Sequence, residues 1–526
     1  MLLSLAFAFK PLCFLLACSV SGGFSFNMGS TAPPALQEYA LGWTSVNGLA
    51  VGVKSEQDGS SPPLWTTSHI PFSLLPNRLP PQAFAHAQEL APLFNKLVDR
   101  ISRDKAWLTS VLADAGAGDP FTAQLLRIYE EEKEVAQPLA LGILRSDYML
   151  HDAKDGSEPC LLQVELNTIA SSFGCLSAKT TSLHRHLIDR FGDDPELGPF
   201  LRSHLKSLGL EGVEGDDAAA LAKRLPDNPT LEVLPRGLAA AHKAFGSGGE
   251  VVLFVVQPGD SAHSTSHNLS HSSLQHLWEN HRVPVMRISL AEIEKEGSID
   301  EKGSGPLAPG RVVSVVYYRA GYTPDDYPTD AEWRARSKVE SSTAVKCPNI
   351  AYHLAGTKKV QQVLAIPGEL EKFLTQPEAD VVRKCFAGLW SVGEEDGPAA
   401  AAAAEAAMAD PTGYVLKPQR EGGGNNLYGE ELIKKLKEAS PQELRSYILM
   451  QRIFPNRQPG MLLNRGQIRQ GETLSELGIY STVLGDGSSD ELLVSEYGGA
   501  LVRTKMEGVD EGGVATGYAV LSSIIL

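Results

Sequence analysis

The sequence predicts a mixed α/β protein, in which a parallel sheet precedes a lobe richer in antiparallel strands. The β-branched runs "VVLFVVQ" (251–257) and "RVVSVVYYR" (311–319) are typical of strands buried on both faces. Between them "LSHSSLQHLWENH" can form a crossover helix, which makes a βαβ unit. After position 414 strand-like runs recur in "YVLKPQ", "SYILMQRI", "SELGIYSTVL" and "ELLVSEYGGALVRT". These later runs indicate an antiparallel-rich α+β lobe.

Helices are expected before the first of these strands and once between the two groups of strands. "LPPQAFAHAQELAPLFNKLVDRIS" opens with prolines suited to a first helical turn, and its leucines recur on one face. The face is marked by Leu90, Leu93, Leu97 and Ile101. Residues 184–245 read as further helices, and the alanine-rich segment 398–410 as a surface helix.

The composition excludes some classes of protein. The chain has 526 residues, 43% of them hydrophobic and 21% charged, so we expect a folded protein of more than one domain. Asp and Glu outnumber Lys and Arg by 63 to 47, for a net charge of −16. Such an acidic balance argues against a nucleic-acid partner but is compatible with a small anionic ligand held by a few cations.

The compartment depends on how residues 1–27 are interpreted. Six cysteines without a CxxC pair favour a reducing compartment. The apolar start is either a signal or plastid-type leader or a gene-model extension ahead of a true start at Met28. We expect a cytoplasmic protein, or one in a plastid or other targeted compartment if the leader is real. No later run is long enough for a spanning helix, so we expect a soluble mature protein without a membrane partner.

The stretch "VLKPQREGGGNNLYGEE" (415–431) contains consecutive glycines beside charges of both signs. Unhindered glycine N–H groups can wrap an anion, Lys417 can meet a phosphate, and Glu421 can hold the Mg²⁺ that accompanies nucleotide phosphates. The alternative is a glycine-rich surface turn. The sequence has no GxxxxGK[ST], GxSxG, HExxH or Rossmann GxGxxG motif. The reaction classes that these motifs indicate are therefore disfavoured.

Two further groups of residues point to the same kind of ligand. Glu165 and Asn167 in "VELNT" lie two apart on a predicted strand and share a face, which suits Mg²⁺, although a strand edge facing water would also explain them. A set of arginines and lysines in an acidic chain suggests a polyanionic ligand: Arg145, Arg319, Arg503, Lys358, Lys417 and Lys505. The evenly spaced His263, His267 and His271 lie in a Ser-rich segment, where a solvated loop is favoured over a metal site.

Several motifs together resemble the eukaryotic glutathione synthetase family, in the family's order over about residues 70–518. They are "LRSDYM", "VELNTIASSFG", "YYRAGYTP", "LAGTKKVQQ", "KPQREGGGNNLYGEE", "SELGIY" and "LVRTK…EGGVATG". The resemblance implies a permuted ATP-grasp fold, a homodimer, and the ligation of γ-glutamylcysteine to glycine with ATP and Mg²⁺. It divides the chain into a leader (1–27), an N-terminal helical and core part (28–249), a substrate-binding βαβ domain (250–360), and the lid with the C-terminal core (361–526).

The resemblance also implies roles for individual residues. Mg²⁺ would be held by Glu165, Asn167 and Glu421. ATP would be surrounded by Glu165, Lys358, Lys417, Pro418, Gln419, Arg420, Glu421, Gly422, Gly423, Gly424, Asn425, Asn426, Tyr428, Met450, Gln451, Arg452, Ile453, Glu476, Lys505 and Glu511. The peptide and glycine would contact Arg145, Ile169, Ala170, Ser171, Ser172, His267, His271, Arg319, Ala320, Gly321, Tyr322, Arg503, Val514 and Ala515. Catalysis would fall to Arg503, Lys358 and Lys417.

The chain departs from the family's pattern at three places. Family members carry a Glu-Arg-Asn element followed by Gln where this chain has "TSHNLSHSS", with His267 and His271 at the equivalent positions. Gln451 stands where the family has an acidic residue near the adenine, and Glu511 stands where the family has an Asp in the closing loop. Two alternatives stay open at this point: a ligase that uses a different amine, and a non-catalytic nucleotide-binding protein, which would be expected to lack Glu421 or Arg503.

Overall fold

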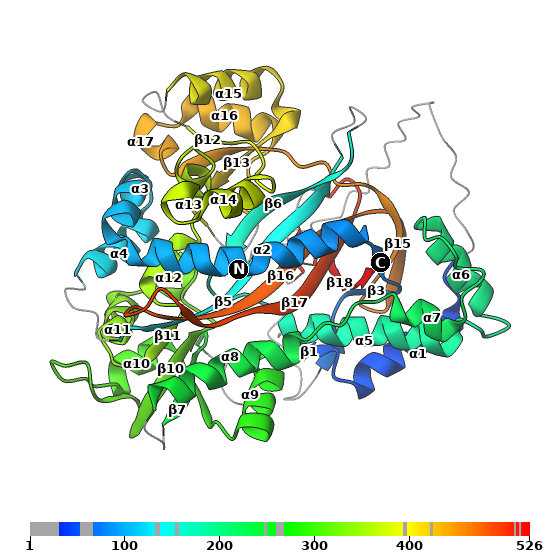
Figure 1. Ribbon diagram of the computed structural model, residues 1–526, viewed down its shortest axis with the longest axis horizontal. Coiled ribbons are helices and arrows are strands. Elements are labelled where there is room, and N and C mark those ends of the chain that lie inside the picture. The colour runs from blue at the N-terminus through cyan, green and yellow to red at the C-terminus, as the bar shows by residue number, and fades with distance from the viewer. Residues whose placement is uncertain are drawn as a thin grey trace, which may run out of the picture.

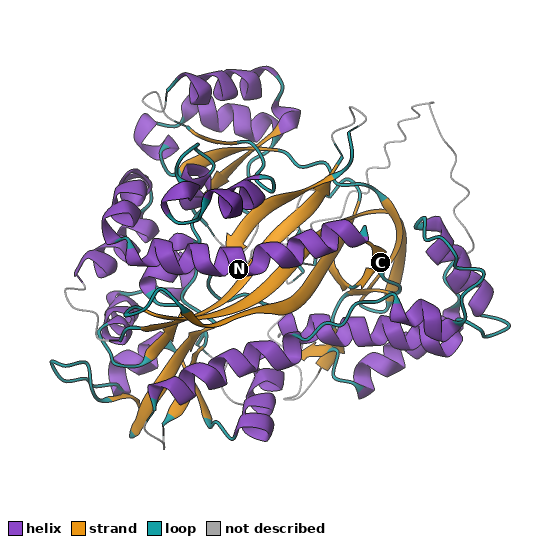
Figure 2. Cartoon of the chain, in the orientation of Figure 1, coloured by secondary structure: helices purple, strands orange, loops and turns teal. Residues whose placement is uncertain are grey.

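A large mixed sheet crosses the middle of the molecule, and helices lie on both of its faces (Figures 1 and 2). A smaller sheet with its own helices stands beside it, at the top of Figure 1. The computed structural model describes residues 31–52, 67–131, 137–152, 157–246, 250–258, 268–392, 397–420, 424–509, 512–514 and 517–526, with the backbone alone at 268–273.

The large sheet has a main path of ten strands. Their order is β15 (Gln458–Asn464), β3 (Phe72–Ser73), β18 (Val520–Ser522), β17 (Leu492–Met506), β16 (Gln467–Asp486), β5 (Leu139–His151), β11 (Val345–Cys347), β10 (Arg311–Tyr318), β7 (Val251–Val255) and β8 (Val285–Ile288). β6 (Cys160–Asn167) pairs with β5, and β9 (Pro306–Ala308) with β10. β15 also pairs with β16, so the first five strands close into a ring.

The two halves of this sheet differ in strand direction, as the sequence predicts. β7, β8, β10 and β11 run parallel, and α9 (Asn268–His281) follows β7 as the crossover helix. β5, β6, β16 and β17 pair antiparallel. The halves join where Lys346 of β11 pairs with Ala140 of β5. The mixed α/β fold class is therefore confirmed, whereas the proposed domain boundaries remain a prediction.

Strand β7, in the parallel half of the sheet, is apolar on both faces. In β7 the side chains of Val251, Leu253 and Val255 enter one core, and those of Val252 and Phe254 enter the other. This alternation explains why the strand reads as a continuous apolar run rather than an alternating one. Helices α2 (Pro81–Arg103) and α12 (Ile350–Ala355) contribute to the first core, and α5 (Gly174–Phe191) and α8 (Thr230–Phe245) to the second.

The small sheet has the antiparallel order β12 (Leu389–Ser391), β14 (Tyr447–Gln451), β13 (Tyr414–Pro418). One of its faces packs Val415 and Met450 with Leu162 of β6. Its other face packs Leu416 and Leu449 with helices α15 (Pro398–Ala409) and α16 (Gly429–Glu438). The short α17 (Pro441–Leu444) leads into β14. The small sheet is thus held over the β6 edge of the large sheet.

Further elements surround these sheets. The other helices are α1 (Pro34–Val46), α3 (Lys105–Gly118), α4 (Pro120–Glu131), α6 (Gly198–Ser207), α7 (Ala218–Lys223), α10 (Leu290–Glu296), α11 (Asp330–Glu340), α13 (Lys358–Leu364) and α14 (Gln376–Arg383). The other strands pair β1 (Ala50–Gly52) with β2 (Thr67–His69) and β4 (Asn77–Arg78) with β19 (Ile524–Ile525). Within the described ranges, no helix has both the length and the apolar character needed to cross a membrane.

Candidate active site

Charged side chains from four neighbouring strands meet on one face of the large sheet. Arg503 of β17 pairs in register with Glu476 of β16, and Gly478 of β16 with Asp147 of β5. Asp147 in turn pairs with Glu165 of β6. Because alternate residues of a strand share a face, Arg145 and Asn167, two residues away from Asp147 and Glu165, join the same group.

Asp147 is the centre of this group, and the side chain is fully buried. Its carboxylate accepts hydrogen bonds from Nε and Nη2 of Arg145 at 2.7 and 2.8 Å, and from Nη2 of Arg503 at 2.8 Å. Nδ2 of Asn167 donates to the same carboxylate at 3.1 Å. The sequence analysis missed this residue, although its position two residues after Arg145 in "LRSDYM" was a usable signal. One carboxylate therefore orients two arginines and an amide.

Gly478 leaves the space in which this contact forms. A Cβ at that position would lie 2.8 Å from Oδ1 of Asp147 and 2.9 Å from Cδ of Arg145. Both atoms are held in the buried ion pair and cannot move aside without breaking it. The glycine of "SELGIY" is therefore required by its neighbours on β5.

Glu165 and Asn167 share a face of β6, as predicted, and their donor atoms fit Mg²⁺. Burial alone would raise the pKa of Glu165, but Lys358, Lys417, Arg503 and Arg145 outweigh it and lower the pKa to about 2. The carboxylate is thus ionised at neutral pH, and Lys358 Nζ lies 3.4 Å from it. Asn167 uses its amide nitrogen on Asp147 and on the Arg145 carbonyl, which orients its oxygen. A carboxylate and an amide oxygen are hard ligands of the kind that Mg²⁺ prefers.

Two lysines approach Glu165 from other elements. Lys417, on β13 of the small sheet, is 4% exposed and donates to the Val164 carbonyl at 3.1 Å. Burial lowers the pKa of Lys417 to about 8, although the nearby Glu165 carboxylate opposes the shift. Lys358 begins α13 and donates to the Arg420 carbonyl at 2.7 Å. The two ammonium groups therefore come together between the small sheet and β6.

Glu476 and Arg503 form the other side of the group. Arg503 hydrogen-bonds to Glu476 as well as to Asp147. Burial raises the pKa of Glu476, and so do the Asp147 and Glu165 carboxylates, while Arg503 opposes the shift. Gly512 lies beside Glu476, since a Cβ there would be 3.5 Å from its Oε2. Lys505, two residues after Arg503 on β17, is 9% exposed.

The segment 169–172 links Arg145 to Arg319. Arg319 donates from Nη1 to the Ala170 carbonyl at 2.7 Å and from Nη2 to Oγ of Ser172 at 3.0 Å. Arg145 Nη1 donates to the Ser172 carbonyl at 3.4 Å, and the Tyr480 hydroxyl bonds to the same carbonyl. Ala170 has a φ of 51°, unusual for a residue other than glycine. Tyr480, which the sequence analysis did not select, thereby supports this segment.

The loop Arg319–Tyr322 is shaped by a carboxylate that the sequence analysis also missed. Oδ2 of Asp326 accepts hydrogen bonds from the backbone nitrogens of Gly321, Tyr322 and Thr323 at 2.8, 3.1 and 3.3 Å. Gly321 has a φ of 95°, and a Cβ there would lie 2.9 Å from the Tyr327 hydroxyl. Glycine is therefore needed at this turn.

Other residues expected around the nucleotide lie on or next to the small sheet. Met450 is buried, Gln451 accepts from the Gly388 nitrogen at 3.0 Å, and the Arg452 guanidinium stands 5.3 Å from the Tyr428 ring. The Arg420 side chain points to another element, because its guanidinium is paired with Asp119, between α3 and α4, at 2.5 Å. Gly424 and Asn425 are exposed, and Val514 is buried.

Some predicted residues lie outside the described part of the chain. They are Glu421, Gly422, Gly423, His267, Glu511 and Ala515, together with the leader. The prediction of a solvated loop is wrong for the backbone of His271, because α9 already begins at Asn268. No cluster of three or more His, Cys, Asp or Glu side chains able to share a metal ion occurs among the described residues, a set that excludes Glu421.

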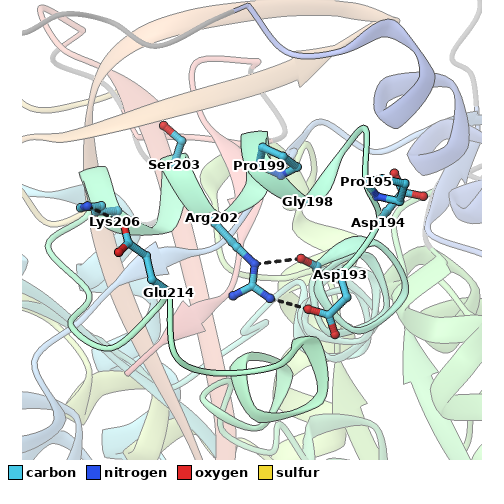
Figure 3. A pocket seen from close by; sticks show the side chains of 10 residues that line it. Asp193, Asp194, Pro195, Gly198, Pro199, Arg202, Ser203, Lys206 and Glu214 are labelled. Carbon is cyan, nitrogen blue, oxygen red and sulfur yellow. Dashed lines mark hydrogen bonds and ion pairs between the residues drawn. The ribbon is translucent and has the colours of Figure 1, made fainter.

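A surface hollow of about 640 Å³ near α6 includes none of the predicted site residues (Figure 3). Its cations already have partners, since Arg202 is paired with Asp193 and Lys206 with Glu214 at 2.7 Å. Arg202 also donates to the carbonyls of Val213 and Asp216 at 2.5 and 2.7 Å. These contacts fasten the loop that follows α6, so the hollow is a structural feature and the charged group on the large sheet is the candidate site.

Comparisons with known proteins show which family the chain belongs to. Residues 32–526 match the model of the family "Eukaryotic glutathione synthase, ATP binding domain". A chloroplastic glutathione synthetase from Solanum lycopersicum is 41% identical over 93% of this chain and 83% of its own. The glutathione synthetase of Homo sapiens is 37% identical over 90% of this chain and 94% of its own.

A solved structure is similar in fold. It is the apo form of a glutathione synthetase-like effector from Globodera pallida, with a TM-score of 0.68 and 23% identity, and the match covers 94% of this chain and 96% of the other. At that identity the likeness shows the fold alone. The family predicted from the motifs is confirmed by the model match and by the curated relatives. The chain belongs to the eukaryotic glutathione synthase family, whose members are ATP-dependent ligases.

Proposed function

We propose that the chain joins γ-glutamylcysteine to glycine with ATP, through an acyl phosphate, and releases glutathione, ADP and phosphate. The observation that carries this proposal is the group centred on Asp147, in which Arg145, Arg503 and Asn167 converge on one carboxylate. The residues assigned to the peptide, the nucleotide and the metal are thus neighbours, as a phosphoryl transfer to the peptide requires.

The nucleotide phosphates would lie between the small sheet and β6. Lys358 and Lys417 meet there, and Arg503 comes from the opposite side. Phosphoryl transfer depends mainly on positioning and charge neutralisation, which these three cations supply. The low pKa of Lys417, about 8, results from its burial, and an arriving phosphate would favour its charged form again.

Mg²⁺ would be held by Glu165 and Asn167, and by Glu421 from outside the described residues. When bound, the ion would neutralise charge on the phosphates. Glu165 suits this role because its low pKa keeps it ionised, and Asn167 because Asp147 fixes its amide nitrogen. Lys505, Glu476 and the segment around Gly512 would complete the surroundings of ATP.

The peptide would be oriented by Arg145, Arg319 and the segment 169–172. Arginine forks match carboxylates, and γ-glutamylcysteine carries two of them, one of which is activated. The cysteinyl carboxylate oxygen attacks the γ-phosphorus, the bond to ADP breaks, and an acyl phosphate results. The glycine amine then attacks the carbonyl carbon, loses a proton, and displaces phosphate. Exclusion of water protects the acyl phosphate from hydrolysis.

The glycine end of the site is expected to be narrow. Val514 is buried, and Ala515 follows it outside the described residues. An extra methylene in an apolar pocket changes discrimination by roughly 10–200-fold. We therefore expect glycine to be preferred over β-alanine and serine, and kcat/KM measured for the three amines tests this. A kcat/KM for β-alanine or serine equal to that for glycine would refute the assignment of Val514 and Ala515.

Two further expectations belong to this proposal. We propose a homodimer, as the family resemblance implies, and sedimentation of the purified chain tests it. We also propose that the protein is cytoplasmic when translation starts at Met28, and plastid or otherwise targeted when residues 1–27 are a working leader. Fluorescent fusions that start at Met1 and at Met28 distinguish the two: identical cytoplasmic distributions would refute the leader.

A further inference from the structure

The corner between α3 and α4 packs against α17 and the residues that lead from α17 into β14 of the small sheet. α3 and α17 lie next to each other in Figure 1. A Cβ on Gly118 would lie 2.7 Å from the Gln442 carbonyl oxygen and 3.0 Å from Cβ of Ser446. The Gln442 side chain donates to the carbonyl of Ala117 at 3.0 Å. The backbone of Gly118 therefore lies close to the backbone of Gln442 and Ser446.

The next residue, Asp119, has two roles at this corner. One carboxylate oxygen, Oδ2, accepts from the nitrogen and hydroxyl of Thr122 at 2.9 and 2.6 Å, which caps α4. The other, Oδ1, lies 2.5 Å from Nη2 of Arg420, two residues after the end of β13. Asp119 is 4% exposed at its side chain and Arg420 is 29% exposed. The ion pair therefore joins the corner to the end of the strand that carries Lys417.

The same short stretch is tied to the start of α13. The Arg420 carbonyl accepts from Lys358 Nζ at 2.7 Å. The Gln419 side chain accepts from the Lys359 nitrogen at 3.1 Å and donates to the Ser446 carbonyl at 3.3 Å. The position of Lys358 thus depends on where the backbone of residue 420 is held.

We propose that the Gly118–Asp119 corner supports the small sheet and fixes its position. Asp119 is then a positioning residue, which acts through Arg420 to place Lys358 and Lys417 for phosphoryl transfer. The inference rests on the proposed function for the roles of the two lysines. It deepens that function, because it explains how helices far from the site in sequence set the distance between the small sheet and β6.

The test compares two ion pairs, each of which joins the α3–α4 region to a segment next to the small sheet. Asp119→Asn keeps the cap of α4, because Asn caps helices as well as Asp does, and it removes the charge facing Arg420. Arg420→Met removes the other partner, and the double variant completes a cycle. The control cycle uses Asp114→Asn and Arg445→Met, a pair 3.4 Å apart with exposures of 59% and 37%. This pair joins α3 to the residue that ends α17, shortly before β14. Exposed pairs of this kind contribute little.

The same quantities are to be measured for the wild type and for every variant of both cycles. They are the KM values for ATP and glycine, the Kd for ADP by calorimetry, the ratio of ADP to glutathione formed, and the midpoint of chemical denaturation. Asp119→Asn and Arg420→Met are each expected to raise the KM for ATP and the Kd for ADP about tenfold, and the double variant no further, as for two residues that act on each other. The KM for glycine should stay unchanged, and both control substitutions should leave all values near those of the wild type.

Three results would overturn the inference. Additive effects in the first cycle would mean that Arg420 acts on the nucleotide directly, and an Asp119→Asn variant as mild as Asp114→Asn would mean that the ion pair positions nothing. Gly118→Ala provides an independent variant, since its Cβ would push the small sheet away, and a wild-type Kd for ADP in that variant would also contradict the inference. The Kd for ADP needs no ligation, so these results stand even if the wild type proves not to use glycine.

Discussion

Asp147→Asn removes the charge on which the candidate site is centred while keeping the size of the side chain. The carboxylate now accepts from Arg145 through both oxygens, from Arg503 and from Asn167. An asparagine has one oxygen and turns an amide donor toward groups that are themselves donors. Arg145, which is 5% exposed, would then stay buried without the carboxylate that it pairs with in the wild type.

The magnitude follows from this burial. Removing one partner of a buried ion pair costs about 3–5 kcal/mol, because the other charge stays buried. Glu476 continues to hold Arg503, and the asparagine oxygen continues to accept one bond, so we expect a loss near the lower limit, about 3 kcal/mol. Both arginines lose their orientation at the same time. The kcat/KM values for ATP and for the peptide should therefore both fall by at least about tenfold.

The assay measures chemical denaturation and steady-state kinetics for Asp147→Asn beside a matched variant, Asp99→Asn. Asp99 is also buried and pairs with Arg103 at 2.6 Å, but it accepts from the Tyr352 hydroxyl on α12 and bonds to none of the site residues that the structure describes. Asp99→Asn should lower stability and leave the KM values unchanged. Wild-type KM values for both substrates in Asp147→Asn would refute the reasoning, and so would equal kinetic effects in the two variants.

Three other substitutions have definite expected outcomes. Gly478→Ala places a Cβ 2.8 Å from Oδ1 of Asp147, so it should reproduce the kinetic loss of Asp147→Asn, and wild-type kinetics would show that the contact is not needed. Glu165→Gln removes the carboxylate whose pKa is about 2, so the Mg²⁺ concentration needed for half-maximal activity should rise, and an unchanged Mg²⁺ titration would contradict its role. Burial lowers the pKa of His184 to about 4 from the usual 6.5, so the folded state resists protonation that the unfolded state accepts. The free energy of unfolding should therefore decrease from pH 7 to pH 5 by about 2 kcal/mol through this residue. His184→Gln should reduce that dependence, and an unchanged pH profile in denaturation would contradict it.

The parts of the fold that the sequence predicts are those with strong local patterns. The run 251–255 is recognisable because every residue is apolar, and the structure buries all of them. Pro81 at a first helical turn and the helix 398–409 are local signals of the same kind. The joining of β11 to β5, and the ring that β15 closes with β16, depend on pairings between distant segments, and no local pattern carries them.

The site shows the same division. Glu165 and Asn167 could be paired from their spacing on one strand, and the structure has them on one face of β6. Asp147 was missed because its role depends on contacts with residues that are distant in the sequence. Its partner Arg503, for example, is 356 residues away in the chain. Asp119 was missed for the same reason, since only the folded chain brings it to Arg420. A short polar motif predicts which residues act, and the strand register decides which of them act together.

The most direct test of the central claim is the release of ADP by the chain from Met28, given γ-glutamylcysteine, ATP and Mg²⁺, with each amine in turn. We expect ADP release that depends on glycine, with one glutathione formed per ADP and lower kcat/KM for β-alanine and serine. ADP release that is independent of the amine, or highest with an amine other than glycine, would contradict the account.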